Sequence, residues 1–402
     1  MRILVHDYAG HPFQVQLSRS LAKRGHEVLH TFCASLSTTP QGALKKTSSD
    51  PASFDVTPVD LGYIIEKSNF KKVFFKEDPA YAAKLVEVVE KFRPDVILSA
   101  NTPLRVNNAL LNYSEATGAS FVFWVQDLFG EAAARILPEK LGSLVGGTAG
   151  RYMKSLEHQL LRRSDGIVLI AEDFKNHIPK TSKPVHVIEN WAPLEEMPVR
   201  LRGNKWAVRH ELENTTNFIY SGTLGMKHNP DLLVGVAEHF KTNQKVRTIV
   251  ISQGQGQDYL KKKKEELGLD NLLLMPFQPF EDLPDVLASA DALMAILEPD
   301  AGVFSVPSKV LSYLCAARPI LMAVPPENLA SKIVDREEAG IVVPPTDKEA
   351  FVTGADQIAS NPERALQMGK NARNYAEATF DIDGITKRFE AVFHEVRAAH
   401  GG

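Results

Sequence analysis

Residues 217–230 read Asn-Phe-Ile-Tyr-Ser-Gly-Thr-Leu-Gly-Met-Lys-His-Asn-Pro, and this stretch contains the pattern on which the chain is built. The apolar run Phe218–Ser221 predicts a buried strand, the glycines after it predict a tight loop, and Pro230 predicts the start of a helix. Glycines in such a loop let the backbone approach a ligand, and Lys227 could neutralise a phosphate there. An ordinary turn with a solvated lysine is the alternative interpretation.

Short apolar runs alternate with amphipathic stretches along the chain, which is typical of βαβ units in parallel sheets. Upstream of residue 190, strands are expected at Ile3–His6, Val28–Phe32, Asp95–Ser99, Ser120–Val125 and Gly166–Ile170. Downstream, they are expected at Phe218–Ser221, Val246–Ser252, Leu272–Met275, Ala292–Ile296 and Pro319–Ala323.

The alternation restarts after a segment at 192–202 that is rich in proline and charge. We therefore expect an α/β protein with two doubly wound, Rossmann-like domains that face each other across a cleft. The predicted boundaries are 1–192 for the first domain and 193–380 for the second. A C-terminal helix at 381–402 is expected to pack back on the first domain.

The composition suits two globular domains, with 402 residues, 44% hydrophobic and 24% charged. A formal net charge of −3 and the lack of a basic stripe argue against nucleic-acid binding. The two cysteines, Cys33 and Cys315, predict no disulfide framework and favour a reducing compartment. No apolar run reaches the roughly 18 residues of a membrane-spanning helix. We therefore expect a cytoplasmic protein, either free or peripheral on the inner face of the cytoplasmic membrane.

Residues 304–314, Phe-Ser-Val-Pro-Ser-Lys-Val-Leu-Ser-Tyr-Leu, predict a second anion-binding element. Pro307 and Ser308 indicate a helix start, with Ser308 as the N-cap. A helix N-terminus directs free N–H groups and a partial positive charge outward. Lys309 in the first turn opposes that charge unless an anion is bound, so its presence favours a phosphate. A lysine side chain turned into water is the alternative.

A third glycine loop, Ser252–Gly256, follows another expected strand, although it lacks the third glycine of a dinucleotide-binding motif. With these loops, the chain resembles the retaining, metal-independent glycosyltransferases of the GT-B fold. It is most similar to the family-4 type, the large bacterial family that makes polysaccharides and lipid-linked sugars. The resemblance rests on the Gly10 loop, Arg24–Val28, Glu157, Arg163–Val168, Val187–Trp191, Gly222–Lys227, Leu283–Ala292 and Pro307–Pro319.

The chain departs from the family pattern at several positions. The family usually carries two glutamates eight residues apart, and Phe304 and Ser312 occupy those positions here. Thr223 stands where an arginine often precedes the loop lysine, and the histidine that the family often has near Gln126 is missing. Ser312 could still hold the donor ribose, by a single hydrogen bond. This pattern resembles a subgroup of amino-sugar transferases from O-antigen and capsule pathways.

The resemblance implies that the second domain binds a nucleotide sugar, preferably UDP-linked, while loops of the first domain bind the acceptor. The expected donor-binding residues are Gly10, Gly222, Thr223, Lys227, Gln253, Phe277, Gln278, Ser305, Ser308, Lys309 and Ser312. The expected catalytic residues are Asp127, His11 and Lys227, and the expected acceptor-binding residues are Asn101 and Gln126. Asp127 follows an apolar strand, where an active-site group would emerge, but it could instead cap the next turn.

No metal and no cofactor are expected. A metal-free transferase must stabilise the departing diphosphate with lysines, hydroxyls and helix N–H groups. The Asp-x-Asp pattern at Asp381–Asp383 is typical of metal-dependent transferases, but it lies far from every glycine loop. We interpret it as a helix N-cap followed by a solvated acid.

The expected function is transfer of an N-acetylhexosamine from the nucleotide to a polyprenyl-diphosphate-linked or saccharide acceptor, with retention, in cell-surface polysaccharide synthesis. Two segments rich in basic and apolar residues, 70–76 and 137–163, could lie on an anionic membrane surface. For the second, packing in the core is the alternative. Two other functions stay open: a sugar-nucleotide 2-epimerase, which shares this architecture, and a non-catalytic nucleotide-sugar-binding scaffold.

Overall fold

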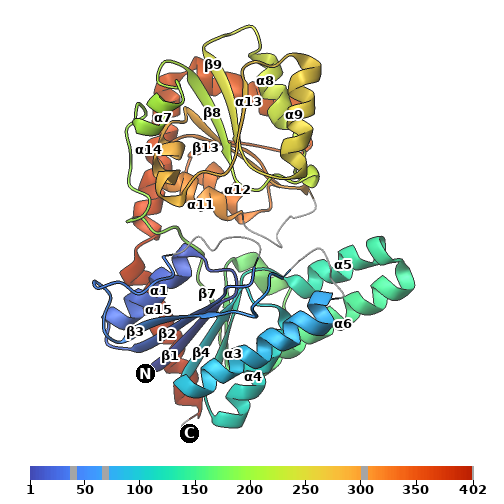
Figure 1. The fold of residues 1–402 in the computed structure, drawn as a ribbon, viewed down its shortest axis with the longest axis vertical. Helices are drawn as coiled ribbons and strands as arrows, with labels where there is room; N and C mark the ends of the chain where they lie inside the picture. Colours follow the sequence, from blue (N-terminus) through green and yellow to red (C-terminus); the bar gives the residue numbers. More distant parts are fainter. Residues whose placement is uncertain (37–42, 66–71, 300–306, 401–402) are drawn as a thin grey trace. The chain divides into compact units, whose positions relative to one another are not determined.

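The computed structural model describes residues 1–36, 43–65, 72–299 and 307–400, which form two compact units (Figure 1). The first unit comprises Met1–Asn190 together with Asp381–Gly402, and the second comprises Trp191–Phe380. The chain thus divides after Asn190 rather than after Ala192, and its C-terminal helix is part of the first unit. Among the described helices, none is long and apolar enough to cross a membrane.

The first unit is built on a seven-stranded parallel sheet with the order β3-β2-β1-β4-β5-β6-β7. Its strands are β1 (Arg2–Asp7), β2 (Glu27–Cys33), β3 (Phe54–Val59), β4 (Val96–Ala100), β5 (Ser120–Val125), β6 (Gly166–Leu169) and β7 (Val185–Val187). The strand order reverses between β1 and β4, and ligands of doubly wound sheets bind beyond the carboxyl ends of the strands at such a point.

Helices cover both faces of this sheet (Figure 1). They are α1 (Pro12–Lys23), α3 (Asp78–Phe92), α4 (Leu104–Thr117), α5 (Phe129–Leu141), α6 (Ser143–Arg163) and α15 (Ile382–His400), with the short turns η1 (Val73–Glu77) and η2 (Glu172–Asn176). Two strands of this sheet were not predicted, nor was β13 (Gly340–Val343) in the other unit. β3 contains Pro58, which is tolerated because β3 is an edge strand, and β7 is too short to show a pattern.

The C-terminal helix α15 completes the core of the first unit. Phe389 is fully buried, and its ring centroid lies 4.8 Å from that of Trp124 in β5. Glu390 accepts a hydrogen bond of 2.9 Å from Arg24, after α1. The side chain of Asp381 accepts from the backbone N–H groups of Asp383 and Gly384, which confirms the interpretation of this Asp-x-Asp as a helix cap.

The second unit contains a six-stranded parallel sheet with the order β10-β9-β8-β11-β12-β13. Its strands are β8 (Thr216–Ser221), β9 (Val246–Ile251), β10 (Leu272–Met275), β11 (Ala292–Ile296), β12 (Ile320–Ala323) and β13 (Gly340–Val343). Its helices are α7 (Lys205–Arg209), α8 (Asp231–His239), α9 (Gln255–Leu267), α10 (Leu283–Ala288), α11 (Ser308–Cys315), α12 (Leu329–Arg336), α13 (Lys348–Ser360) and α14 (Pro362–Thr379), with the turns η3 (Met226–His228) and η4 (Phe280–Asp282).

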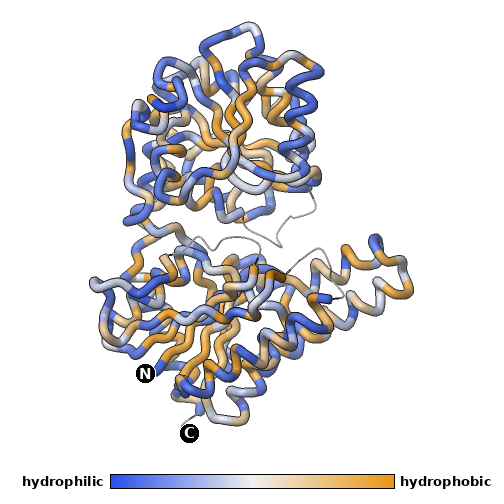
Figure 2. Tube along the Cα trace, viewed as in Figure 1, coloured by the Kyte–Doolittle hydropathy of each residue, from blue (hydrophilic) through white to orange (hydrophobic). Residues whose placement is uncertain are grey.

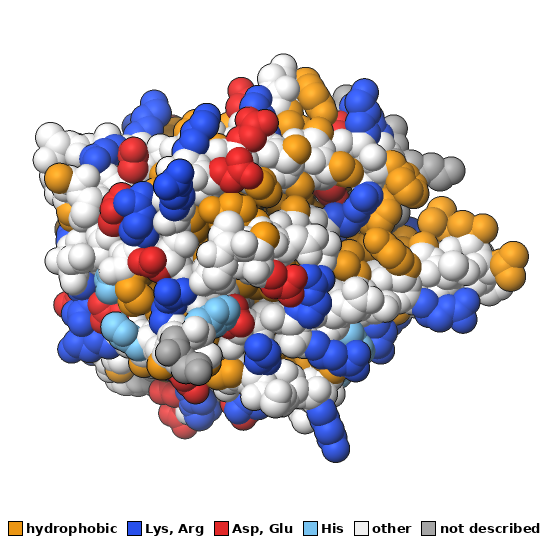
Figure 3. Space-filling model, turned by 90° about the horizontal axis from the view of Figure 1, so that it is seen from below, with side chains coloured by type: hydrophobic (Ala, Val, Ile, Leu, Met, Phe, Trp, Pro, Cys, Tyr) orange, Lys and Arg blue, Asp and Glu red, His pale blue; other side chains and the backbone are white. Residues whose placement is uncertain are grey.

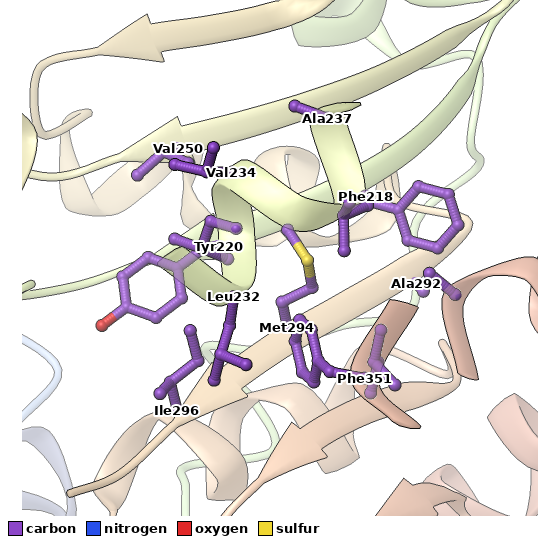
Figure 4. Packing of buried hydrophobic residues seen from close by; sticks show 14 of the residues in the cluster. Phe218, Tyr220, Leu232, Val234, Ala237, Val250, Ala292, Met294, Ile296 and Phe351 are labelled. Carbon is purple, nitrogen blue, oxygen red and sulfur yellow. The ribbon is translucent and has the colours of Figure 1, made fainter. Parts of the chain in front are cut away.

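Hydrophobic strands fill the interior of each unit, while the outer helical faces are mostly hydrophilic (Figure 2). In the second unit, Phe218, Met294 and Phe351 belong to one buried cluster between β8, β11 and α13 (Figure 4). Tyr220 adds its ring to that cluster while its hydroxyl points away from it (Figure 4). Two doubly wound α/β domains were predicted, and the structure confirms this fold class.

Replacing Phe389 by alanine should destabilise the first unit, because it opens a cavity beside Trp124 in a fully buried site. We expect a loss of about 3–5 kcal/mol, measured by urea unfolding followed by tryptophan fluorescence. Leu366→Ala removes an exposed side chain and should change stability by less than about 0.5 kcal/mol. Equal, small effects of both substitutions would show that α15 is dispensable.

Candidate functional site

The sheet of the second unit reverses its strand order between β8 and β11, and most predicted donor-binding residues lie around this point. Gly222, Thr223 and Lys227 follow β8, Gln253 follows β9, and Phe277 and Gln278 follow β10. Ser308, Lys309 and Ser312 lie on α11. Ser305 lies outside the described residues, as does Phe304. Ligands of parallel α/β sheets bind at such a reversal, so the placement fits a ligand site.

Lys309 is the central charge of this region. Its Nζ lies 3.8 Å from the centroid of the Tyr220 ring and donates a hydrogen bond of 2.6 Å to the Tyr220 hydroxyl. A Cβ atom built on Gly222 would lie 3.0 Å from the same Nζ, so the ammonium sits directly against the glycine loop. Burial lowers the pKa of Lys309 to about 7. The alternative of a lysine side chain turned into water is therefore wrong.

Two tyrosines hold the glycine loop in place. The Tyr313 hydroxyl accepts from the backbone N–H of Ser221 at 3.0 Å and donates to its carbonyl oxygen at 3.1 Å. The Tyr220 hydroxyl donates to the carbonyl oxygen of Thr223 at 2.7 Å. Both rings are buried, so the loop is tied to the core rather than to solvent-exposed groups. Sequence reasoning missed both roles.

The start of α11 differs from the prediction in one respect. Ser308 is the first helical residue, Pro307 occupies the N-cap position, and no side chain caps the helix. The N-cap role predicted for Ser308 is therefore wrong, because the extended backbone needed at an N-cap falls on the preceding proline. The exposed hydroxyl of Ser308 is left at the helix start, one turn before the half-buried Ser312.

Lys227 and His228 lie beside the glycine loop, where Lys227 adds further positive charge. Lys227 donates a hydrogen bond of 2.7 Å to Glu298, just beyond β11, and remains largely exposed. His228 accepts from the backbone N–H of Gly225 at 3.0 Å. Burial and then the nearby Lys309 and Lys227 lower the pKa of His228. The sequence analysis assigned a role to neither His228 nor Glu298. For His228, its position directly after Lys227 in the glycine loop was the signal that could have revealed it.

The loops after β9 and β10 border the same region. The backbone N–H of Gly256 donates to the carbonyl oxygen of Leu224 at 3.2 Å, and a Cβ on Gly256 would overlap that oxygen. Gln278 uses its amide locally, accepting from Trp206 Nε1 at 3.0 Å and donating to Pro276 at 2.9 Å. Phe277 and Gln253 are exposed, so the Phe277 ring is accessible for stacking on a ligand.

In the first unit, polar side chains gather where β1 and β4 end. The buried carboxylate of Asp7 accepts from the backbone N–H of His11 and lies 3.1 Å from its Nδ1. Asn101 Nδ2 lies 3.3 Å from the same Nδ1, so two predicted residues meet. Although burial alone would raise the pKa of Asp7, the charge of His11 and its hydrogen bonds lower it. Gly10, with φ of 74°, makes the turn between Asp7 and His11. Asp7 was not predicted.

A second polar pair follows β5. Gln126 and Asn190 exchange two amide hydrogen bonds, of 3.1 Å and 2.6 Å. The side chain of Gln126, a predicted acceptor-binding residue, is therefore held by Asn190. Asp127, the next residue, is half-buried. The N–H of Gly130 in α5 donates to the buried carboxylate of Glu157 at 2.9 Å. The loop that carries Asp127 is therefore held at both ends.

Comparisons with known proteins agree with this geometry. The model "Glycosyl transferase 4-like domain" matches residues 11–191, and the model "Glycosyl transferases group 1" matches residues 204–375. The chain is a glycosyltransferase of the group 1 type.

This transferase is also similar to individual proteins over most of its length. It is 24% identical over 306 residues, 74% of each chain, to WcaI of Escherichia coli (strain K12), a glycosyl transferase named for colanic acid biosynthesis. A sucrose-phosphate synthase from Thermosynechococcus elongatus superposes with a TM-score of 0.75 at 15% identity, over 99% of this chain and 100% of that one. HepE of Anabaena, solved in complex with UDP-glucose, superposes with a TM-score of 0.69 at 14% sequence identity, over 98% of this chain and 99% of HepE. The fold is therefore of the GT-B type.

Gly222→Ala should impair nucleotide binding by the transferase. The residue has φ of 137°, which strains any other L-residue, and its Cβ would press on the Lys309 ammonium. We expect UDP affinity, measured by calorimetry, to fall at least about tenfold. The matched control is Gly225→Ala in the same loop, where the nearest atom is the flexible Lys227 Cγ at 3.7 Å. An unchanged affinity in Gly222→Ala would place the diphosphate elsewhere.

Nucleotide binding to the transferase should take up a proton above pH 7.5. Lys309, with a pKa of about 7, is then largely neutral in the free protein, and a bound diphosphate favours its charged form. UDP affinity should thus fall as the pH rises, by up to about tenfold per pH unit. Calorimetry in two buffers of different ionisation enthalpy measures the uptake. Lys309→Gln should abolish it, whereas Lys227→Gln should weaken binding and keep it; uptake in both variants would exclude Lys309 as the group.

Proposed function

We propose that this transferase moves an N-acetylhexosamine from a UDP-linked donor to a polyprenyl-diphosphate-linked or saccharide acceptor. Transfer proceeds with retention and without a metal ion, in the synthesis of a cell-surface polysaccharide such as O-antigen or capsule. The observation that carries the proposal is the partly buried ammonium of Lys309 against the glycine loop at the strand-order reversal of the second unit.

The donor diphosphate would lie over the glycine loop. Lys309 lies against this loop, while Lys227 and the N–H groups of the first turn of α11 add positive charge. A departing diphosphate gains negative charge as the glycosidic bond breaks, and preorganised cations in a half-buried site stabilise that charge more than water does. In this proposal the side chains of the protein supply the charge that a metal ion supplies in other transferases.

The nucleoside would extend from the diphosphate toward the loops after β9 and β10. There the exposed ring of Phe277 can stack on a base, Gln253 can bond the base or ribose, and Ser312 can bond the ribose. The UDP-glucose bound by HepE, which shares the fold, supports uracil as the base. The choice of an N-acetylhexosamine rests on the resemblance to amino-sugar transferases.

The acceptor would bind at the ends of β1, β4 and β5 in the first unit. Asp7 orients the imidazole of His11, and Asn101 contacts the same ring, so this nitrogen-rich group is preorganised to bind a hydroxyl or a phosphate. Asp127 offers a carboxylate that can accept the proton of an attacking hydroxyl. The similarity to WcaI, named for colanic acid biosynthesis, supports a cell-surface polysaccharide as the product.

An acceptor with a polyprenyl tail would be embedded in a bilayer. The proposal therefore places the protein on the inner face of the cytoplasmic membrane, with a surface that contacts anionic lipid.

The test combines UDP-N-acetylglucosamine with a polyprenyl-diphosphate-linked sugar in the presence of EDTA, and measures UDP release and the anomeric configuration of the product. We expect acceptor-dependent UDP release with retention. Asp127→Asn and Lys309→Met should each lower kcat/KM by about 100-fold, since each removes a proton acceptor or a charge used in the transition state. Asp270→Asn, at an exposed carboxylate, should leave it unchanged.

Three outcomes would contradict the proposal. Nucleotide binding without transfer to any acceptor would favour a scaffold. A 2-epimer formed without acceptor would identify an epimerase. Loss of transfer in EDTA, restored by Mg²⁺ or Mn²⁺, would replace the metal-free mechanism.

A further inference from the structure

Helices α5 and α6 form a hairpin that extends away from the sheet of the first unit (Figure 1). The C-terminal half of α6 packs on the body of the unit, where Leu156, Leu160 and Leu161 are buried. This half agrees with the core-packing alternative for segment 137–163. The opposite end of the hairpin, around the turn at Gly142, behaves differently, because its large apolar side chains are not buried.

The seam between the two helices is made of small residues. A Cβ on Gly146 would overlap the Leu137 carbonyl oxygen, and one on Gly150 would lie 2.7 Å from Ala134 Cα. The backbones of α5 and α6 therefore touch, and no large side chain fits between them there. Close packing through a Gly-x-x-x-Gly seam is the way helices associate inside lipid, where large apolar side chains have no reason to turn inward.

The large apolar side chains of this end face outward instead. Leu144 is 83% exposed and Val145 is 64% exposed, and Leu141 and Ile136 beside them are also exposed. These four residues are called the hairpin tip. Figure 3 shows hydrophobic side chains over the end and one side of the arm. An ordinary helical hairpin in water buries its large apolar residues in the seam, so this arrangement is inverted.

The charges around the hairpin tip favour an anionic surface. Arg135, Lys140 and Arg151 are exposed on this part of the hairpin, where Glu139 is an exposed acid, so basic side chains predominate. Lys and Arg side chains line the opposite edge of the arm (Figure 3). Cations beside an apolar patch complement the phosphates of anionic lipids. They would repel the same cations of a second copy in a symmetric contact. The hairpin also has no helix that could span a bilayer, so it would lie in the interface.

We propose that the hairpin tip inserts into the interfacial layer of an anionic bilayer and anchors the first unit there. The inference deepens the proposed function, on which it rests for the lipid-linked acceptor, by assigning the membrane contact to one surface. Elsewhere along α6, Tyr152 is exposed, and its ring centroid lies 6.0 Å from that of Phe74, whose neighbour Phe75 is exposed on η1.

The test is co-sedimentation of the full chain with vesicles of phosphatidylglycerol and phosphatidylcholine, compared with phosphatidylcholine alone. We expect binding to the anionic vesicles only. The double substitution Leu144→Ser and Val145→Ser should weaken it at least about tenfold, because two side chains no longer leave water. Lys140→Glu with Arg151→Glu should weaken binding to a similar degree and make the remaining binding less sensitive to salt, because the screened attraction is gone.

The matched control is Leu201→Ser, which removes a side chain that is 82% exposed but lies on the second unit, and it should bind as the unaltered protein does. Vesicle binding needs neither donor nor acceptor, so a failure to bind vesicles can be told apart from a failure of the proposed transfer. The tip substitutions should leave the rate of transfer to a water-soluble acceptor unchanged. Undiminished vesicle binding by the Leu144/Val145 variant would overturn the proposal. So would a dimer, seen by light scattering, that this variant loses, since a second copy would then be the occupant.

Discussion

The contact between the Lys309 ammonium and the glycine loop is the interaction on which the rest of the proposed site depends. Holding the charged form of Lys309 here without an anion costs free energy, and burial lowers the pKa of Lys309 to about 7 for this reason. The protein keeps it there through Tyr220, whose ring faces the charge and whose hydroxyl links it to the Thr223 carbonyl. The site is thus built for a negative ligand before the ligand arrives, so little reorganisation is left for the binding step.

The first unit uses the same arrangement with a different chemistry. Its strand order also reverses, between β1 and β4, and a glycine turn again follows the strand on one side of the reversal. Here the buried group is the carboxylate of Asp7, and the residue it orients is His11. One unit therefore presents a cation backed by aromatic rings, and the other presents an imidazole backed by a buried acid. That difference fits the proposal that the second unit binds a diphosphate and the first binds a hydroxyl-bearing acceptor.

The parts of the fold that were predictable are those encoded by short runs of sequence. The strand and glycine loop at 217–230 and the helix α8 that begins after Pro230 are encoded in consecutive residues, as is the helix start that carries Lys309. The roles of Tyr220 and Tyr313 could not be predicted, because their hydroxyls act on the loop only after β8 and α11 have packed together. Edge strand β3 was missed because a proline interrupts it.

Side-chain contacts between residues far apart in the sequence also could not be predicted. Glu298 meets Lys227 across the strand-order reversal, and Gln126, after β5, meets Asn190 in the segment after β7. For a related reason, the sequence did not show that the large apolar side chains of the hairpin tip face outward. An amphipathic pattern shows that a helix has an apolar side, but only the glycine seam at Gly146 and Gly150 shows that this side turns away from its partner helix.

Because α15 completes the core around Trp124, the first unit is discontinuous in the chain, while the second unit lies between its two parts. On the ribosome, the sheet of the first unit emerges before the second unit, but it lacks its closing helix until α15 has been made. The second unit, by contrast, is contiguous and can fold as soon as it has emerged. During synthesis the second unit would therefore mature before the first, whose incomplete core would expose the Trp124 side of its sheet for longest.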